Sequence, residues 1–257
     1  MLTNAQKRQF VEEGYLQIPG AVPKVLIDAA LRAVNHSIGE IGLGGEDMAN
    51  SRSAFHCAEL LQAPVILDLF HKSPVMELAE DLMGHGNVLP LTRAKPYPRF
   101  PLPLGAEPTA PRGHLDGIGN GSNGMAKGEY RRGFTAFAVI YLVDVPESYS
   151  GNFTVWPKSH RAYADYFKQV GYEIQANGMP HIDLPEGPHM ITGRAGDLVL
   201  AHHQIFHGPC ANASPNVRQA VIARLQHKEC AQIGYDAYID IWREWAGVWD
   251  VLEPVTA

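Results

Sequence analysis

The sequence GRAGDLVLAHHQIFHGP, residues 193–209, decides the fold expected for this 257-residue chain. Gly196-Asp197 predicts a turn, the apolar run 198–201 predicts a buried β-strand, and Gly208-Pro209 predicts a second break. His207 stands directly before that second break. Because turn residues flank the segment on both sides, a helix through it is disfavoured, and we expect His207 to lie in β-rich surroundings.

The same β-rich pattern recurs on both sides of this segment. Short runs of β-branched, aromatic and aliphatic residues alternate with clusters of Gly, Pro and Asn. This alternation is typical of a β-barrel or β-sandwich, which we place at about residues 86–228. The runs are residues 88–91, 134–143, 153–156, 198–201 and 217–225.

Helical patterns precede the β-rich part, at about residues 4–83. A first helix is expected to end near Gly14, because glycine tolerates the left-handed conformation that closes helices. A short strand follows at residues 15–18, and a second helix is expected from Pro23. Residues 59–83 continue the helical pattern, which proline interrupts at two places.

Aromatic and aliphatic side chains recur at helical spacing at about residues 232–249. They predict a last helix that packs on the outside of the sheet, where these side chains serve core packing. No internal repeat, low-complexity tract or long linker divides the chain. We therefore expect a single domain over residues 1–257, mainly β with flanking α-helices.

Composition limits the classes of function. The chain is 46% hydrophobic and 19% charged, and its formal net charge of −6 argues against a nucleic-acid partner, which would require a basic surface. The three cysteines, Cys57, Cys210 and Cys230, fit neither a disulfide framework nor a CxxC zinc site. No signal-peptide pattern and no apolar run of membrane-spanning length occur. We expect a cytoplasmic protein with no membrane partner.

The candidate chemistry begins at His114-Leu115-Asp116. In an extended segment His114 and Asp116 point to the same face, because side chains alternate with a period of two. A histidine from elsewhere would complete two imidazoles and one carboxylate, the ligand set of non-haem iron(II) oxygenases. A second triplet, His181-Ile182-Asp183, competes with the first but has the pattern of a surface turn. The candidates for the distant ligand are His202, His203 and His207.

Several segments follow one another in a specific order: His114-Leu115-Asp116, GNFTVWPKSH at residues 151–160, Gly196-Asp197, His207-Gly208 and Arg218. The opening FVEEGYL, residues 10–16, has the pattern of a helix followed by a Gly-Tyr entry into a strand. In this order and spacing, the segments resemble the phytanoyl-CoA dioxygenase family of Fe(II)- and 2-oxoglutarate-dependent oxygenases. The resemblance spans about residues 10–225. It depends on order and spacing, because a His-x-Asp triplet alone is a weak motif.

The resemblance implies a jelly-roll core, the double-stranded β-helix that cupins also have. It implies that His114, Asp116 and His207 bind Fe(II). It further implies that Arg218 pairs with the distal carboxylate of the cosubstrate 2-oxoglutarate, a task that suits a planar guanidinium. Arg224 lies six residues further on, on the same face of a regular strand, and is the alternative to Arg218.

The family's reaction consumes 2-oxoglutarate and O2, yields succinate and CO2, and commonly hydroxylates an unactivated C–H bond; ascorbate can support it. Asp116 favours hydroxylation over halogenation, because related halogenases have a small residue at that place. Desaturation, epimerisation and ring formation begin with the same hydrogen abstraction and stay open. The expected substrate is a small-molecule metabolite.

Two other functions remain open. One is a cupin-like metal-dependent hydrolase or isomerase that uses the same three ligands without an oxidising cosubstrate. The other is a non-catalytic jelly-roll protein that binds a metal or another ligand. Arg218 discriminates between these functions and an oxygenase, because only the oxygenase requires a site for 2-oxoglutarate.

Other motifs are assigned smaller roles. Residues 119–124 match GxGxxG, but no βαβ context surrounds them, so we interpret them as a loop beside the metal within the irregular segment 97–133. Arg93 and Lys95 could contact the cosubstrate or the substrate. Ser159-His160 is interpreted as structural, since no nucleophile elbow accompanies it.

Overall fold

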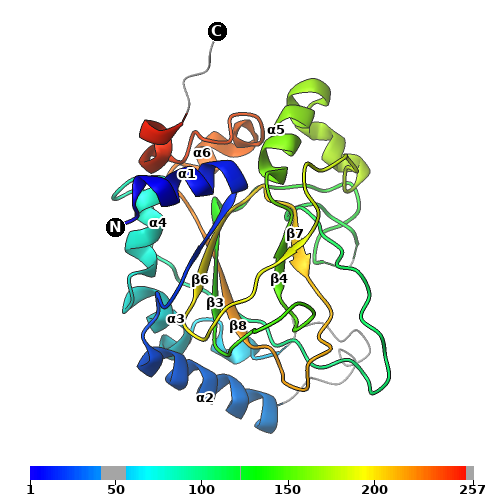
Figure 1. The fold of residues 1–257 in the computed structure, drawn as a ribbon. Helices are drawn as coiled ribbons and strands as arrows, with labels where there is room; N and C mark the ends of the chain where they lie inside the picture. Colours follow the sequence, from blue (N-terminus) through cyan, green and yellow to red (C-terminus); the bar gives the residue numbers. More distant parts are fainter. Residues whose placement is uncertain (42–55, 122, 253–257) are drawn as a thin grey trace.

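The computed structural model describes residues 1–41, 56–121 and 123–252, and in these residues two antiparallel β-sheets form the centre of the protein (Figure 1). The larger sheet has five strands in the order β1-β6-β3-β8-β2, and the smaller has three in the order β5-β4-β7. The strands are β1 (Tyr15–Ile18), β2 (Lys95–Pro96), β3 (Ala136–Tyr141), β4 (Phe153–Val155), β5 (His189–Met190), β6 (Leu198–His202), β7 (His207–Pro209) and β8 (Ala220–Leu225).

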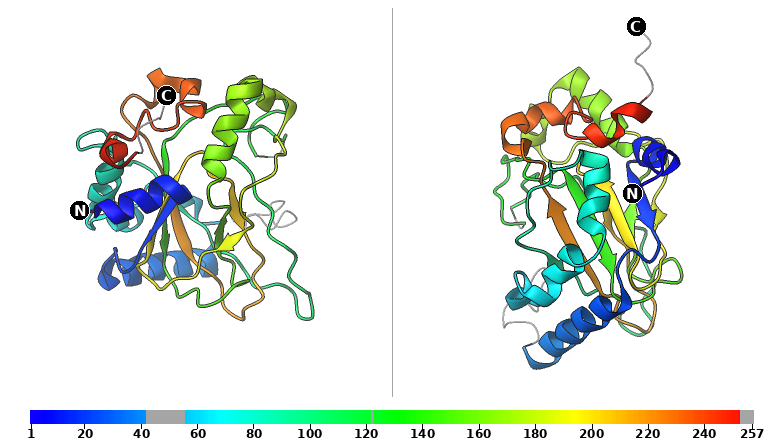
Figure 2. Two further views of the ribbon diagram at one scale, coloured as in Figure 1. Left: turned by 45° about the horizontal axis from the view of Figure 1, so that its top comes forward. Right: turned by 90° about the vertical axis from the view of Figure 1, so that its left-hand side faces the viewer.

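Four N-terminal helices pack on one side of the larger sheet; the two cyan helices among them lie on its left in Figure 1 and toward the viewer in the right-hand view of Figure 2. Their apolar side chains share one buried core with alternate sheet residues such as Ala138, Leu200 and Ala223. Side chains on a strand alternate between faces, so the remaining residues turn the other way. The helices are α1 (Asn4–Glu13), α2 (Lys24–Glu40), α3 (Pro64–His71) and α4 (Val75–Met83), and the 3-10 turn η3 (Ala58–Leu60) precedes α3.

The opposite face of the larger sheet turns toward the smaller sheet. Phe137, Val139 and Ala201 share a second apolar core with Phe153 of β4. The ring of His207 lies 4.4 Å from that of Phe137 and 5.7 Å from that of Phe153. This apolar core therefore extends to the ring of His207, one of the candidate ligands.

The sequence predicted most of these elements. β3, β4 and β8 lie within predicted runs, β6 extends its predicted run by one residue, and α3 and α4 begin at or next to the two interrupting prolines. The strand expected at residues 15–18 is β1, which extends the larger sheet by pairing with β6. Antiparallel sheets with flanking helices are confirmed. The description as mainly β understates the helices, since several have ten or more residues whereas the strands have two to six.

The prediction missed one helix, α5 (Ser159–Val170). Pro157-Lys158 has the pattern of a turn, and Lys158 does adopt the left-handed conformation with φ of 65°. The chain then enters a helix instead of a loop. Its apolar face carries aromatic residues, Tyr163 and Phe167, whose intrinsic helix propensity is modest, so tertiary packing decides its conformation.

The prediction of one continuous helix at about residues 232–249 is wrong. Gly234, with φ of 54°, follows the first short helix after a single turn. The aromatic residues then pack on different elements: the ring centroid of Tyr238 lies 5.5 Å from that of Phe167 in α5, whereas the ring centroid of Trp245 lies 4.8 Å from that of Phe10 in α1. The segment consists of α6 (Cys230–Ile233), η5 (Gly234–Tyr238) and η6 (Ala246–Val251).

Part of the predicted N-terminal helical region, residues 42–55, lies outside the described residues. Within the described ranges, none of the helices combines the length and apolar character needed to cross a bilayer. The single domain over residues 1–257 stays a prediction.

Three buried histidines join α5 to the C-terminal segments. The ring of His160 lies 5.5 Å from that of His202, which lies 4.4 Å from that of His203. His202 also stacks on Trp245, and its Nε2 lies 3.0 Å from the carbonyl oxygen of Ile241. Burial lowers the pKa of all three imidazoles below 6.5, that of His202 to about 3. These histidines are therefore neutral packing residues.

We predict that the protein loses stability as the pH falls from 6.5 to about 5. Unfolded imidazoles take up protons in this range, whereas the three buried ones stay neutral in the folded state. The free energy of unfolding then falls by up to about 1.4 kcal/mol per pH unit for each histidine. Urea unfolding at a series of pH values measures this slope.

The substitution His203→Phe should flatten the slope, because it removes one site of proton uptake in the unfolded state. His36→Gln, on the exposed face of α2, replaces a histidine that the fold does not bury and serves as the matched control. A free energy of unfolding that stays constant over this pH range would contradict the prediction.

Candidate metal centre

Two backbone hydrogen bonds bring distant parts of the chain together at the candidate site. The N–H of His114 donates to the carbonyl of His207 over 2.8 Å, and the N–H of His207 donates back to that of His114 over 3.1 Å. Gly208 permits this approach, since a Cβ there would overlap the carbonyl oxygen of Arg112. The two histidine rings consequently lie beside each other, with centroids 4.7 Å apart.

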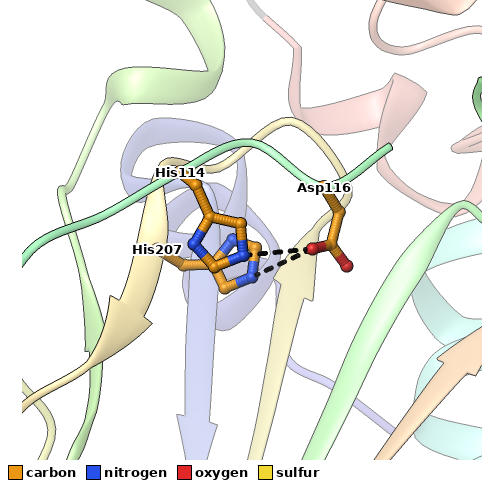
Figure 3. Close-up of side chains that lie close together, drawn as sticks. All are labelled: His114, Asp116 and His207. Atoms are coloured by element: carbon orange, nitrogen blue, oxygen red, sulfur yellow. Dashed lines mark hydrogen bonds and ion pairs between the residues drawn. The ribbon is translucent and has the colours of Figure 1, made fainter. Parts of the chain in front are cut away.

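Asp116 completes a cluster of three side chains (Figure 3). Its Oδ1 lies 3.2 Å from Nε2 of His114 and 3.9 Å from Nε2 of His207. One ligand atom from each residue lies within 4.8 Å of the others, the one such group of His, Cys, Asp and Glu within residues 1–41, 56–121 and 123–252. The structure thus brings together the three residues selected from the sequence.

The donor set fits a divalent transition metal. Two imidazole nitrogens and one carboxylate oxygen form the facial arrangement that suits iron(II) and leaves coordination positions open. Nδ1 of His207 donates to the carbonyl of Ile205 over 3.0 Å, so its Nε2, which faces Asp116, carries no proton. The side chain of His114 is 50% exposed, which gives the site an opening on that side.

The charge states of these groups also suit metal binding. Burial, with a smaller contribution from His114, lowers the pKa of His207 to about 4. Burial alone would raise the pKa of Asp116, but the hydrogen bond from His114 and the charge of Arg224 hold it well below 3.8. Near neutral pH the site therefore offers a neutral imidazole and an ionised carboxylate, the forms that bind metals.

The three residues line one part of a cavity of about 110 Å³ between the two sheets. Phe137, Phe153 and Ile222 form an apolar wall, and two arginines of the β8 segment, Arg218 and Arg224, bring positive charge. The cavity therefore combines the possible metal ligands with a cationic surface. Its other residues are Tyr97, Arg99, Gly208 and Pro209.

Arg218 is buried in this cavity, with 5% of its surface exposed. Its Nε donates to the carbonyl of Gly151 over 2.6 Å, and its Nη1 donates to that of Tyr97 over 2.8 Å. None of the carboxylates in the described ranges forms an ion pair with it. Burial lowers its pKa to about 10, which still leaves the guanidinium charged at neutral pH.

Arg224, the alternative to Arg218 in the sequence, has a different partner. Its Nε and Nη2 donate to Oδ2 of Asp116 over 2.8 and 2.6 Å. The two arginines thus differ in charge balance: Arg224 has a carboxylate partner inside the protein, and Arg218 does not.

Sequence reasoning did not single out Tyr97 and Arg99, which also line the cavity. Lys95 of β2 pairs with Ile222, and Arg99 forms a bridge with Arg218. Residues 95, 97 and 99 therefore alternate along a segment next to β8. This two-residue alternation was the signal in the sequence that could have identified them.

Other candidates from the sequence lie away from the cluster. His181 and Asp183 of the second triplet are exposed, and His202 and His203 belong to the buried histidine group. The hydroxyl of Ser159 donates to the carbonyl of Trp156, a structural role at the start of α5. The loop at residues 119–124 lies near the cluster, with Ser122 outside the described residues.

A second cavity, of about 390 Å³, shares His114 with the first. Its walls come from the loop that follows Asp116 and from residues 176–179, at the end of η4 (Tyr172–Asn177). Asparagine side chains and Lys127 stand among apolar residues such as Leu115 and Ile118 in these walls. His114 therefore lies between an arginine-lined cavity and a larger cavity of mixed lining.

Comparison with solved structures identifies proteins of similar fold. No protein-family model matches the sequence, and no curated protein does. The non-heme α-ketoglutarate-dependent carbocyclase SnoK from nogalamycin biosynthesis is 20% identical, with a TM-score of 0.54 over 88% of this chain and 84% of SnoK. HygX from Streptomyces hygroscopicus, solved with nickel and 2-oxoglutarate, is 16% identical, with a TM-score of 0.56 over 88% of each chain.

AviO1 from Streptomyces viridochromogenes Tue57 is also similar, at 15% identity and a TM-score of 0.55 over 88% of this chain and 96% of AviO1. At these identities the similarity establishes a shared fold. The paired antiparallel sheets with flanking helices described above are consistent with it.

We predict that Asp116→Ala and His207→Ala each weaken the binding of Co(II) on the order of 100-fold or more, because each removes one of three ligands. Competition with a chromophoric chelator measures the affinity. His181→Ala and Asp183→Ala are matched controls, since they alter the same kind of triplet at an exposed place. If both sets of variants bind Co(II) equally well, the metal centre is misassigned.

We also predict that Gly208→Ala lowers the affinity for Co(II) and the melting temperature. The added Cβ would overlap the carbonyl oxygen of Arg112 and push apart the segments that carry His114 and His207. Gly187→Ala is the control, because a Cβ there has no neighbour within 4 Å and the residue has no positive φ. Unchanged Co(II) affinity in Gly208→Ala would show that the bridge does not set the ligand geometry.

Proposed function

We propose that this protein is an Fe(II)- and 2-oxoglutarate-dependent dioxygenase that hydroxylates a C–H bond of a small-molecule substrate. In this proposal His114, Asp116 and His207 bind the iron, and Arg218 binds the distal carboxylate of 2-oxoglutarate. The observation that carries it is the position of Arg218: a buried cation, without a carboxylate partner in the described residues, lines the same cavity as the three candidate ligands.

The charge of Arg218 is the first argument. Burying a charge is costly unless an opposite charge accompanies it. The carbonyls of Gly151 and Tyr97 satisfy two of its N–H groups but do not neutralise the guanidinium. A carboxylate from a ligand would neutralise it through parallel hydrogen bonds.

The lining of the cavity is the second argument. A ligand that pairs with Arg218 and also binds a metal held by His114 and His207 would suit this lining with a carboxylate at one end and metal-binding oxygens at the other. A 2-oxo acid with a second carboxylate has this form. The structure of the similar protein HygX, solved with nickel and 2-oxoglutarate, supports the choice of 2-oxoglutarate.

Iron(II), with 2-oxoglutarate and O2, would supply the oxidising chemistry, releasing succinate and CO2 and adding one oxygen to the substrate, with ascorbate to keep the iron reduced. The residues of the chain hold and orient the reactants. Phe137 and Phe153 pack on the His207 ring and make that wall apolar. Nδ1 of His207 is fixed by Ile205, so the ring keeps its Nε2 toward the site.

Asp116 supports hydroxylation as the outcome. Its carboxylate occupies the place that a halide would need, which disfavours halogenation. The similar structures include a carbocyclase and an epimerase, so the fold is compatible with several outcomes of hydrogen abstraction. The mass of the product distinguishes them, because hydroxylation alone adds one oxygen atom.

We place the substrate in the second cavity. It adjoins the candidate centre at His114, the most exposed of the three ligands, and its volume of about 390 Å³ is larger than that of the arginine-lined cavity. HygX has been solved with hygromycin B, and the similar epimerase SnoN, which is 17% identical with a TM-score of 0.52, has been solved with nogalamycin RO. These bound molecules support a small-molecule substrate.

The arrangement of the sheets supports a jelly-roll core at about residues 86–228. Both sheets are antiparallel and contribute to one apolar core, as in a double-stranded β-helix. β1 then adds an edge strand from the N-terminal part of the same single domain.

We predict that 2-oxoglutarate, added to the anaerobic Fe(II) protein, produces a visible charge-transfer band, and that O2 then converts it to succinate. Arg218→Ala should weaken 2-oxoglutarate binding about 10- to 100-fold, because a charge-assisted hydrogen bond contributes about 1.5–3 kcal/mol. Arg218→Lys should retain part of the affinity, and neither variant should weaken Co(II) binding in the absence of 2-oxoglutarate.

Other outcomes identify the rival functions. A protein that binds Fe(II) but neither binds nor consumes 2-oxoglutarate is a metal-dependent hydrolase or isomerase or a binding protein, and the oxygenase proposal fails. Incubation of a metabolite extract with Fe(II), 2-oxoglutarate and ascorbate, followed by mass spectrometry, identifies the substrate. Asp116→Ala serves as the inactive control.

A further inference from the structure

The pairing of Arg224 with Asp116 goes beyond what the proposed function requires. Two N–H groups, from Nε and Nη2, converge on Oδ2 of Asp116 at 2.8 and 2.6 Å. The other oxygen, Oδ1, is the one that faces Nε2 of His114 and His207, at 3.2 and 3.9 Å. The two carboxylate oxygens therefore have different partners: Oδ2 accepts hydrogen bonds from Arg224, and Oδ1 faces the two histidines.

The position of Arg224 is itself well fixed. It lies opposite Phe137 in the pairing of β3 with β8, so its side chain leaves the sheet on the same face. Its guanidinium carbon lies 5.5 Å from the ring centroid of Phe134 and 5.8 Å from that of Phe137. These two rings pack edge to face, with centroids 4.6 Å apart. Cation–π contact thus holds the guanidinium over a rigid aromatic pair.

We propose that Arg224 is a positioning residue that makes Asp116 a ligand through Oδ1 alone. This inference rests on the proposed function for the identity of the metal. A carboxylate that is free to turn can bind a metal through both oxygens and fill one more coordination position. With Oδ2 held by Arg224, that position stays open for 2-oxoglutarate or O2.

Arginine suits this task better than lysine. Nε and Nη2 form a planar pair of donors, which fixes the direction of the guanidinium as well as its distance from Oδ2. Lysine would supply a single charge without this constraint. Partners that orient a metal ligand in this way commonly change metal affinity 10- to 100-fold when removed.

The test measures metal binding without 2-oxoglutarate, so it does not depend on turnover. Arg224→Met, Arg224→Gln and Arg224→Lys are compared with the wild-type protein for Co(II) affinity and for the visible absorption spectrum of bound Co(II), which reports coordination number. Arg218→Met is the control for charge, because it also removes a cation from the same cavity but at a residue without contact to Asp116. Thermal melting of the metal-free proteins reports whether each variant folds.

We expect Arg224→Met and Arg224→Gln to bind Co(II) about 10- to 100-fold more weakly and to change the Co(II) spectrum. Arg224→Lys should recover part of the affinity, whereas Arg218→Met should bind Co(II) at least as tightly as the wild-type protein and leave its spectrum unchanged.

If Arg224 acted only as a positive charge near the metal, its removal would reduce repulsion and tighten Co(II) binding. Tighter binding, or an unchanged affinity and spectrum, therefore overturns the inference while leaving the proposed function intact. A wild-type protein that binds no Co(II) and no Fe(II) overturns both.

Discussion

The antiparallel bridge between His114 and His207 is the constraint on which the rest of the site depends. β7 is held in register by β4, so the smaller sheet fixes His207, and two backbone hydrogen bonds then join the irregular segment that carries His114 to β7. A shift of one residue would turn His114 to the opposite face, because side chains alternate along an extended chain. Gly208 is needed at this point because any larger residue would meet the backbone of Arg112.

The buried basic side chains of this protein differ in how their charge is balanced. Arg224 is neutralised by Asp116, whereas the buried imidazoles of His202 and His203 avoid a charge because burial lowers their pKa. Arg218 keeps its charge at neutral pH, because a guanidinium stays ionised there. No carboxylate of the described chain pairs with it. We propose that an exogenous anion neutralises this buried cation, which lines a cavity beside the three candidate metal ligands.

The sequence was sufficient for the parts that depend on local pattern. Alternating and apolar runs located β3, β6 and β8, and two-residue spacing placed His114 and Asp116 on one side. It was insufficient where long-range packing determines the conformation. α5 follows a segment with the pattern of a turn, and the C-terminal aromatic residues pack on both α5 and α1, which are contacts that the spacing of residues in one segment does not reveal. The second cavity likewise depends on a contact between two distant loops.

Arg218 and Arg224 show why strand periodicity alone cannot assign a role. The two residues are separated by an even number of positions, so strand alternation places both side chains in the cavity. A guanidinium at either position could bind a carboxylate. The difference arises from neighbours that come from elsewhere in the chain: the carbonyls of Tyr97 and Gly151 at one arginine, and Asp116 at the other. Carbonyls orient a guanidinium but leave its charge uncompensated, whereas a carboxylate does both. The role of each arginine therefore follows from its counter-charge, which only the folded chain defines.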